Sequence, residues 1–189
     1  MRKNKSLYTM VVTGLLMAVG MVLPYITGQI QIISRIISPL HIPVLICGLC
    51  CGWRWGLALG VVLPVFRGLT LGFPPFPTNA LPMAFELGAY GLFTGLLYPL
   101  FLKLLKEKSR LPTMLLALIS AMILGRLVGG AARGLLLSLG FISAGTPYTF
   151  SAFFTSYFVS TAPGALIHIV LIPVVVSVLE KAKLSPMVR

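Results

Sequence analysis

The apolar stretch at residues 111–141 constrains the fold more than any other feature, because it is long enough to cross a lipid bilayer and yet contains two arginines. Thirty residues of α-helix measure about 45 Å, and the hydrocarbon core of a bilayer is about 30 Å thick. Arg126 and Arg133 stand at positions i and i+7, so they project from nearly the same face of a helix. An arginine at the bilayer centre costs roughly 3 kcal/mol and is usually paired or faces a wet cavity. The stretch therefore predicts a helix bundle with an internal, positively charged pocket.

The composition extends this prediction to the whole chain. Hydrophobic residues make up 58% of the 189 residues, and only 10% are charged, against roughly 25% in soluble domains. The mean hydropathy of +1.01 also indicates an integral membrane protein. The net charge of +12 does not indicate a nucleic-acid partner, because the basic residues are scattered at the ends of apolar segments.

The apolar segments predict an all-α integral membrane protein, a bundle of six transmembrane helices that forms a single membrane domain over residues 1–189. The expected spans are residues 7–25, 39–52, 56–71, 80–105, 111–141 and 150–179. Pro163-Gly164 should break or bend the last of them.

The positions of lysine and arginine predict the orientation of the bundle. With six spans, both termini share one side with the turn between spans two and three and the loop between spans four and five. Most of the 15 Lys and Arg residues lie on that side, and only Arg35 lies on the other side outside the spans. Since basic loops stay inside the cell, both termini are predicted to be cytoplasmic.

This orientation gathers polar residues in the outer half of the bundle. Glu86 is the only acid in any predicted span, which makes it a candidate functional residue, and we expect an arginine as its partner. A purely structural Arg–Glu pair is the alternative. For Arg67 the alternative is snorkelling to the interface, and for His41 it is an interfacial cap. The candidate substrate-binding residues are Arg133, Glu86, Arg67, Arg126, Asn79, His41, Gln29 and Tyr148.

The charges of these residues predict the kind of ligand. Three arginines against one glutamate leave a surplus of positive charge, which favours an anion such as a carboxylate. The pocket should open to the outside and hold one small molecule.

Catalytic and metal-binding motifs are missing from the sequence. The three acidic residues are all Glu, there are two His, and no P-loop, H-E-x-x-H or G-x-S-x-G motif is present. Cys47, Cys50 and Cys51 include a C-x-x-C spacing, but no second Cys or His pair stands nearby, so packing is favoured over a metal. We therefore expect a binding protein that is not an enzyme and needs no cofactor or metal. Any active uptake would take its energy from a partner or an ion gradient.

Gly14 and Ala18 form a small-xxx-small pair in the first predicted span. Such a pair permits close contact between helices. It could serve internal packing or provide a docking face for another membrane subunit, and the sequence favours neither.

Several motifs together carry a family resemblance. They are residues 38–48 (SPLHIPVLICG), 52–56 (GWRWG) and 83–91 (MAFELGAYG), in addition to Gly14-x-x-x-Ala18 and the six spans. Over nearly its whole length the chain resembles the substrate-binding S component of an energy-coupling factor (ECF) vitamin transporter, and it is similar to members grouped with pantothenate uptake.

The resemblance implies a multi-pass protein of a prokaryotic cell membrane that binds a vitamin from outside with high affinity. Its implied partners are an ECF transmembrane coupling protein and two cytoplasmic ATPases, which would hydrolyse the ATP. The family's docking motif in span one, usually Ala-x-x-x-Ala, maps onto Gly14 and Ala18.

Two other functions are compatible with the residues alone. A stand-alone carrier or channel for small anions would transport by itself in liposomes. A structural membrane protein with internally paired arginines would bind no ligand saturably.

Overall fold

The computed structural model describes residues 2–26, 38–105, 110–143 and 147–182. Within these ranges the ordered elements are all helical. In chain order they are α1 (Arg2–Ile26), α3 (His41–Cys51), α4 (Trp53–Leu71), α5 (Ala80–Leu104), α6 (Arg110–Ser138), α7 (Phe150–Phe154), the π-helical turn η1 (Thr155–Val159) and α8 (Ala162–Lys181).

Five helical segments are long and apolar enough to cross a membrane: Ser6–Tyr25, Trp53–Leu71, Ala80–Leu104, Arg110–Ser138 and Phe150–Lys181. The segment expected as the second span forms α3, which has 11 residues and measures only about 16 Å. Most of its residues are buried, so α3 lies inside the bundle. The predicted count of six full spans is therefore not confirmed.

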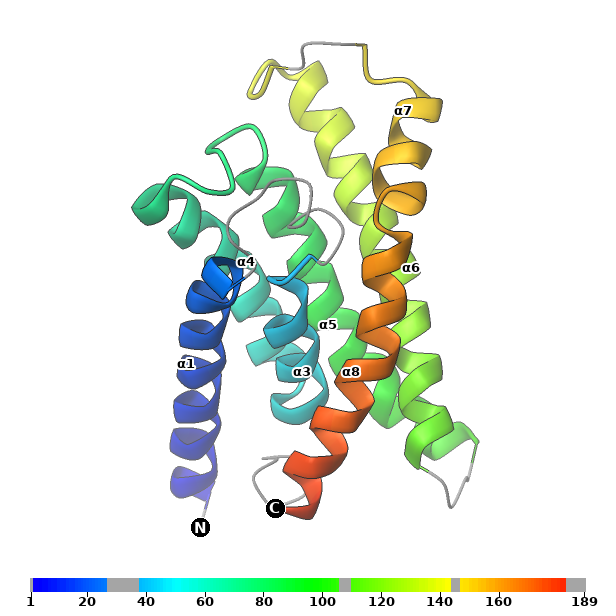
Figure 1. Ribbon diagram of the computed structural model, residues 1–189. Helices are drawn as coiled ribbons and strands as arrows, with labels where there is room; N and C mark the ends of the chain where they lie inside the picture. The colour runs from blue at the N-terminus through cyan, green and yellow to red at the C-terminus, as the bar shows by residue number, and fades with distance from the viewer. Residues whose placement is uncertain (1, 27–37, 106–109, 144–146, 183–189) are drawn as a thin grey trace.

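The last span is interrupted as its sequence predicts. Residues 160–161 form a turn between η1 and α8, and Pro163 stands in the first turn of α8. Proline suits this position because the first amide groups of a helix have no intrahelical acceptor. The segment before this turn lies near the end of α6 (Figure 1).

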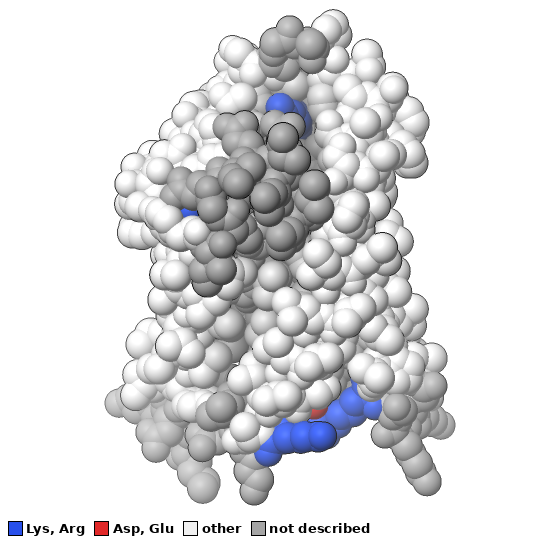
Figure 2. All heavy atoms as spheres, viewed as in Figure 1, with Lys and Arg blue, Asp and Glu red and all other residues white. Residues whose placement is uncertain are grey.

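The beginning of α1 and the end of α8 lie at the same end of the bundle (Figure 1). Figure 2 shows a band of Lys and Arg side chains across this end. The helix ends at this end of the bundle carry Arg54, Lys103, Arg110 and Lys181. The assignment of this end to the cytoplasm stays a prediction from the distribution of basic residues.

Glycines bring α4 and α5 into contact backbone to backbone. A Cβ atom added at Gly91 would lie 2.1 Å from the carbonyl oxygen of Gly56, and one at Gly60 would lie 2.2 Å from that of Leu87. In lipid, such close packing supplies much of the attraction between helices. The contact also fixes the position of α5, which carries Glu86.

Gly91→Ala is expected to lower the melting temperature of the protein in detergent. The new methyl group would meet backbone atoms, which cannot rotate away as a side chain can, so the helices must separate. Overpacking of this kind costs typically 1–3 kcal/mol. Gly14→Ala is the matched control, because a Cβ there meets nothing within 4 Å. Equal melting of the two variants and the wild type would contradict the packing argument.

Candidate functional site

A pocket of about 350 Å³ is lined by residues in the half of the bundle that lies away from the start of α1. Its walls come from the start of α3, the loop between α4 and α5, the first turns of α5, the end of α6 and the segment around η1. The polar side chains among its lining residues are Ser38, His41, Asn79, Glu86, Arg133, Tyr148, Ser156, Tyr157, Ser160 and Thr161. The structure thus brings together five of the predicted site residues: His41, Asn79, Glu86, Arg133 and Tyr148.

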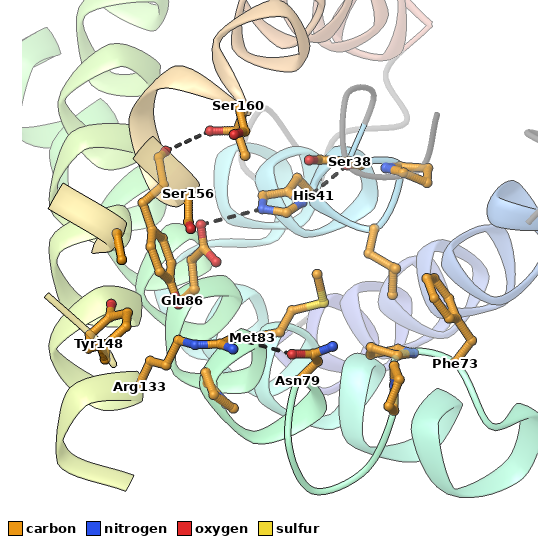
Figure 3. A pocket seen from close by; sticks show the side chains of 18 of the residues that line it. Ser38, His41, Phe73, Asn79, Met83, Glu86, Arg133, Tyr148, Ser156 and Ser160 are labelled. Atoms are coloured by element: carbon orange, nitrogen blue, oxygen red, sulfur yellow. Dashed lines mark hydrogen bonds and ion pairs between the residues drawn. The ribbon is translucent and has the colours of Figure 1, made fainter. Parts of the chain in front are cut away.

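One carboxylate oxygen of Glu86 has a hydroxyl donor and an imidazole ring as its neighbours. Its Oε1 atom accepts a hydrogen bond of 2.8 Å from the Tyr90 hydroxyl and lies 3.7 Å from Nε2 of His41. The centre of the His41 ring lies 5.1 Å from that of Tyr90 and 5.7 Å from that of His168. Its Nδ1 atom lies 3.1 Å from the Ser38 carbonyl, which can only accept a hydrogen bond, so this contact requires a proton on Nδ1. Figure 3 shows His41 and Glu86 facing each other.

The prediction that an arginine pairs with Glu86 is therefore wrong: no described arginine lies within 4.0 Å of its carboxylate oxygens. Glu86 lies level with Gly129 of α6, where an added Cβ would be 2.6 Å from the Glu86 Cβ. Arg126 and Arg133 stand about one helical turn to either side of that glycine. Each arginine consequently finds another partner.

Arg133 projects from α6 into the pocket. Its Nη1 atom donates a hydrogen bond of 3.2 Å to Oδ1 of Asn79, the residue before the first turn of α5. Within the described part of the chain, no acidic side chain lies within 4.0 Å of this guanidinium. Arg133 is thus a half-buried cation with a neutral partner.

Tyr148 covers the same part of α6. Its hydroxyl donates a hydrogen bond of 3.1 Å to the carbonyl of Gly130. Burial raises the pKa of the Tyr148 phenol, so the side chain stays neutral near Arg133. Tyr148 therefore adds no negative charge to the pocket.

Arg67 and Arg126 do not line the pocket. Arg67 is fully buried, lies 5.1 Å from the centre of the Tyr25 ring and donates to the Met21 carbonyl, so it joins α4 to α1 and does not snorkel. Arg126 lies 5.7 Å from the Phe158 ring centre, with Nη2 3.4 Å from the Thr161 carbonyl. The prediction of three arginines against one glutamate is therefore incorrect for the described residues: those that line the pocket include one arginine, Arg133, and one glutamate, Glu86.

One predicted site residue lies outside the described residues, and several lining residues were not predicted. Gln29 lies outside the described residues. The hydroxyl groups of Ser156, Ser160 and Thr161 were not predicted to line the pocket, because the stretch 150–179 reads as an ordinary apolar span. The spacing of Ser156 and Ser160, one helical turn apart, is the pattern that could have revealed them.

Gly14 and Ala18 are both exposed on the outer face of α1. The residues of α1 that face the bundle include Thr13, which contacts Cys47 at 3.7 Å, and Gly20, which packs against Leu63. Internal packing of the small pair is thus not observed among the described residues, and a docking role stays a prediction.

Cys47 and Cys50 are buried in the core. No group of three or more His, Cys, Asp or Glu side chains in the described ranges could hold a metal ion.

A helical membrane bundle with a polar pocket of this size is typical of a membrane protein that holds a small molecule. The chain belongs to the substrate-specific component family of ECF transporters, whose family model matches residues 8–179. Searches of curated proteins and of solved structures gave no match.

Membership in this family establishes the general role of the protein. It is the substrate-binding subunit of an ECF transporter and not an enzyme, and it works with the ECF membrane and ATPase subunits on a small-molecule substrate. It is a multi-pass protein of a prokaryotic cytoplasmic membrane.

Proposed function

We propose that the pocket binds a small carboxylate from outside the cell, with pantothenate as the favoured ligand. The observation that carries this proposal is Arg133, a half-buried cation in the pocket whose contact is the neutral Asn79 amide. A carboxylate would pair with the guanidinium through two parallel hydrogen bonds, a geometry that arginine favours over lysine.

The size and lining of the pocket suit such a ligand. Its volume of about 350 Å³ lies at the lower end of the range for small-molecule sites, roughly 300–1,000 Å³. Pantothenate has a carboxylate for Arg133 and an amide and hydroxyls for the Asn, Ser and Glu side chains. The elements that carry the lining residues lie away from the basic end of the bundle, which supports access from outside.

Two measurements test the ligand. Native mass spectrometry of gently purified protein should reveal a retained small molecule by its mass. Titration calorimetry should then show that pantothenate binds at least tenfold more tightly than panthenol, in which an alcohol replaces the carboxylate. Equal affinity for the two compounds would contradict the proposed carboxylate site.

Reconstitution in liposomes tests the transport role. We expect ligand binding by this chain alone and ATP-driven uptake only when the coupling protein and both ATPases are present. Uptake by this chain alone would instead support a stand-alone carrier.

A further inference from the structure

Three pocket residues follow one face of α5 in a fixed order. Asn79, Met83 and Glu86 stand at positions i, i+4 and i+7, and all three line the pocket. At 1.5 Å per residue, the levels of Asn79 and Glu86 are about 10 Å apart along the helix axis. Figure 3 shows Arg133 beside Asn79, Glu86 beside His41, and Met83 between the two pairs. The pocket therefore has a cationic end at Arg133 and an acidic end at Glu86, with Met83 between them.

The acidic end is built to present one oxygen atom to a ligand. The contacts with Tyr90 and His41 both involve Oε1 of Glu86, and Glu86 lines the pocket, so Oε2 is the oxygen that remains to accept a hydrogen bond from a ligand. Since Tyr90 is buried and its ring packs against Gly125, the carboxylate has a fixed position. An ionised carboxylate accepts hydrogen bonds and cannot donate them.

We propose that Glu86 determines specificity by requiring a hydrogen-bond donor at the ligand end far from Arg133 and by rejecting a second acid there. This inference rests on the proposed carboxylate site and adds the substrate class: elongated monocarboxylates with a hydroxyl, amide N–H or ammonium group at the far end. The serines near Glu86 can donate or accept, so they accommodate either kind of group. Glu86 is the acid among the described lining residues, so it imposes the choice, because like charges in a desolvated site repel each other strongly.

A matched series of eight-carbon probes tests this inference. The probes are octanoate, 8-hydroxyoctanoate, 8-aminooctanoate and octanedioate, with 1,8-octanediol as the uncharged member, and their affinities are measured by NMR saturation-transfer titration. The wild type should bind the hydroxyl- and amine-terminated acids at least tenfold more tightly than octanedioate. In Glu86→Gln this difference should fall below threefold.

A second acid provides the control. Glu180 pairs with Arg110 at 3.2 Å near the opposite end of the bundle, so Glu180→Gln removes the same charge away from the pocket and should keep the wild-type ratio. Glu86→Asp keeps the charge and should still reject octanedioate, which covers the case in which Glu86→Gln does not fold.

The two proposals fail in different ways. A wild type that binds octanedioate as tightly as 8-hydroxyoctanoate, or an unchanged ratio in folded Glu86→Gln, overturns the role of Glu86 and leaves the carboxylate site standing. If the wild type binds no acid of the series more tightly than 1,8-octanediol, the carboxylate site itself is wrong, and the role of Glu86 falls with it.

Discussion

Arg133→Ala is expected to weaken pantothenate binding at least tenfold while the helical bundle stays folded. Arg133 contacts Asn79 through one hydrogen bond and is only half-buried, so its loss removes little packing. A hydrogen bond to a charged group is worth about 1.5–3 kcal/mol, which corresponds to roughly ten- to a hundredfold in affinity. Titration calorimetry gives the affinity, and circular dichroism during heating reports whether the fold is kept.

Two further variants separate the possible causes of such a loss. Arg133→Lys keeps the charge but not the planar fork, so its affinity should fall between those of the wild type and Arg133→Ala. Arg54→Ala removes a positive charge from an exposed position at the basic end and should bind as the wild type does. An unchanged affinity in well-folded Arg133→Ala would rule out the proposed carboxylate contact.

The extents of the long helices follow closely from the sequence. The predicted spans 56–71, 80–105 and 111–141 differ from α4, α5 and α6 by at most a few residues at either end. Apolar runs bounded by basic or proline-rich segments leave little choice of helix ends, since lipid requires every backbone hydrogen bond to be made within the helix. Short runs are less certain: the stretch 39–52 is apolar enough for a span, and only its packing shows that α3 is a short buried helix.

The neighbours of the arginines could not be predicted, because they depend on how α6 is placed along α5. That placement is set by Gly125 against the Tyr90 ring and by Gly129 against Glu86. The position of a glycine in the sequence does not show which side chain it will receive. A shift of α6 by one turn along α5 would have brought Arg126 or Arg133 to Glu86, which is the pairing that the sequence predicts.

The sequence predicted the location of the pocket better than it predicted which charged residues line it. Asn79, Glu86 and Arg133 were placed in the outer half by orientation and depth alone, and the structure brings them to the same pocket. Arg67 stands at a similar depth, but it contacts Tyr25 and Met21 of α1 and does not line the pocket. Depth in the membrane thus predicts the level of a side chain, whereas the helix packing decides which way it faces.

Replacing both Gly14 and Ala18 with leucine is expected to abolish ATP-driven uptake with the partner subunits and to leave ligand binding nearly unchanged. Both residues are exposed on α1, and a Cβ atom added at Gly14 would meet no described atom within 4 Å. The pocket is lined by other elements, so the substitutions do not touch it. A smooth face lets a partner helix approach closely, and in lipid this packing must supply much of the association. Affinity and uptake are measured on the same preparation.

Gly20→Leu provides the contrast on the same helix. Gly20 is buried, and even a Cβ there would lie 2.6 Å from a Leu63 side-chain atom, so a leucine should disturb folding, binding and uptake together. The Gly14 and Ala18 double variant should lose uptake alone, because its new side chains project away from the bundle. If that variant transports at the wild-type rate, this face of α1 does not dock a partner. If it loses binding in parallel with Gly20→Leu, the face contributes to the fold of the chain itself.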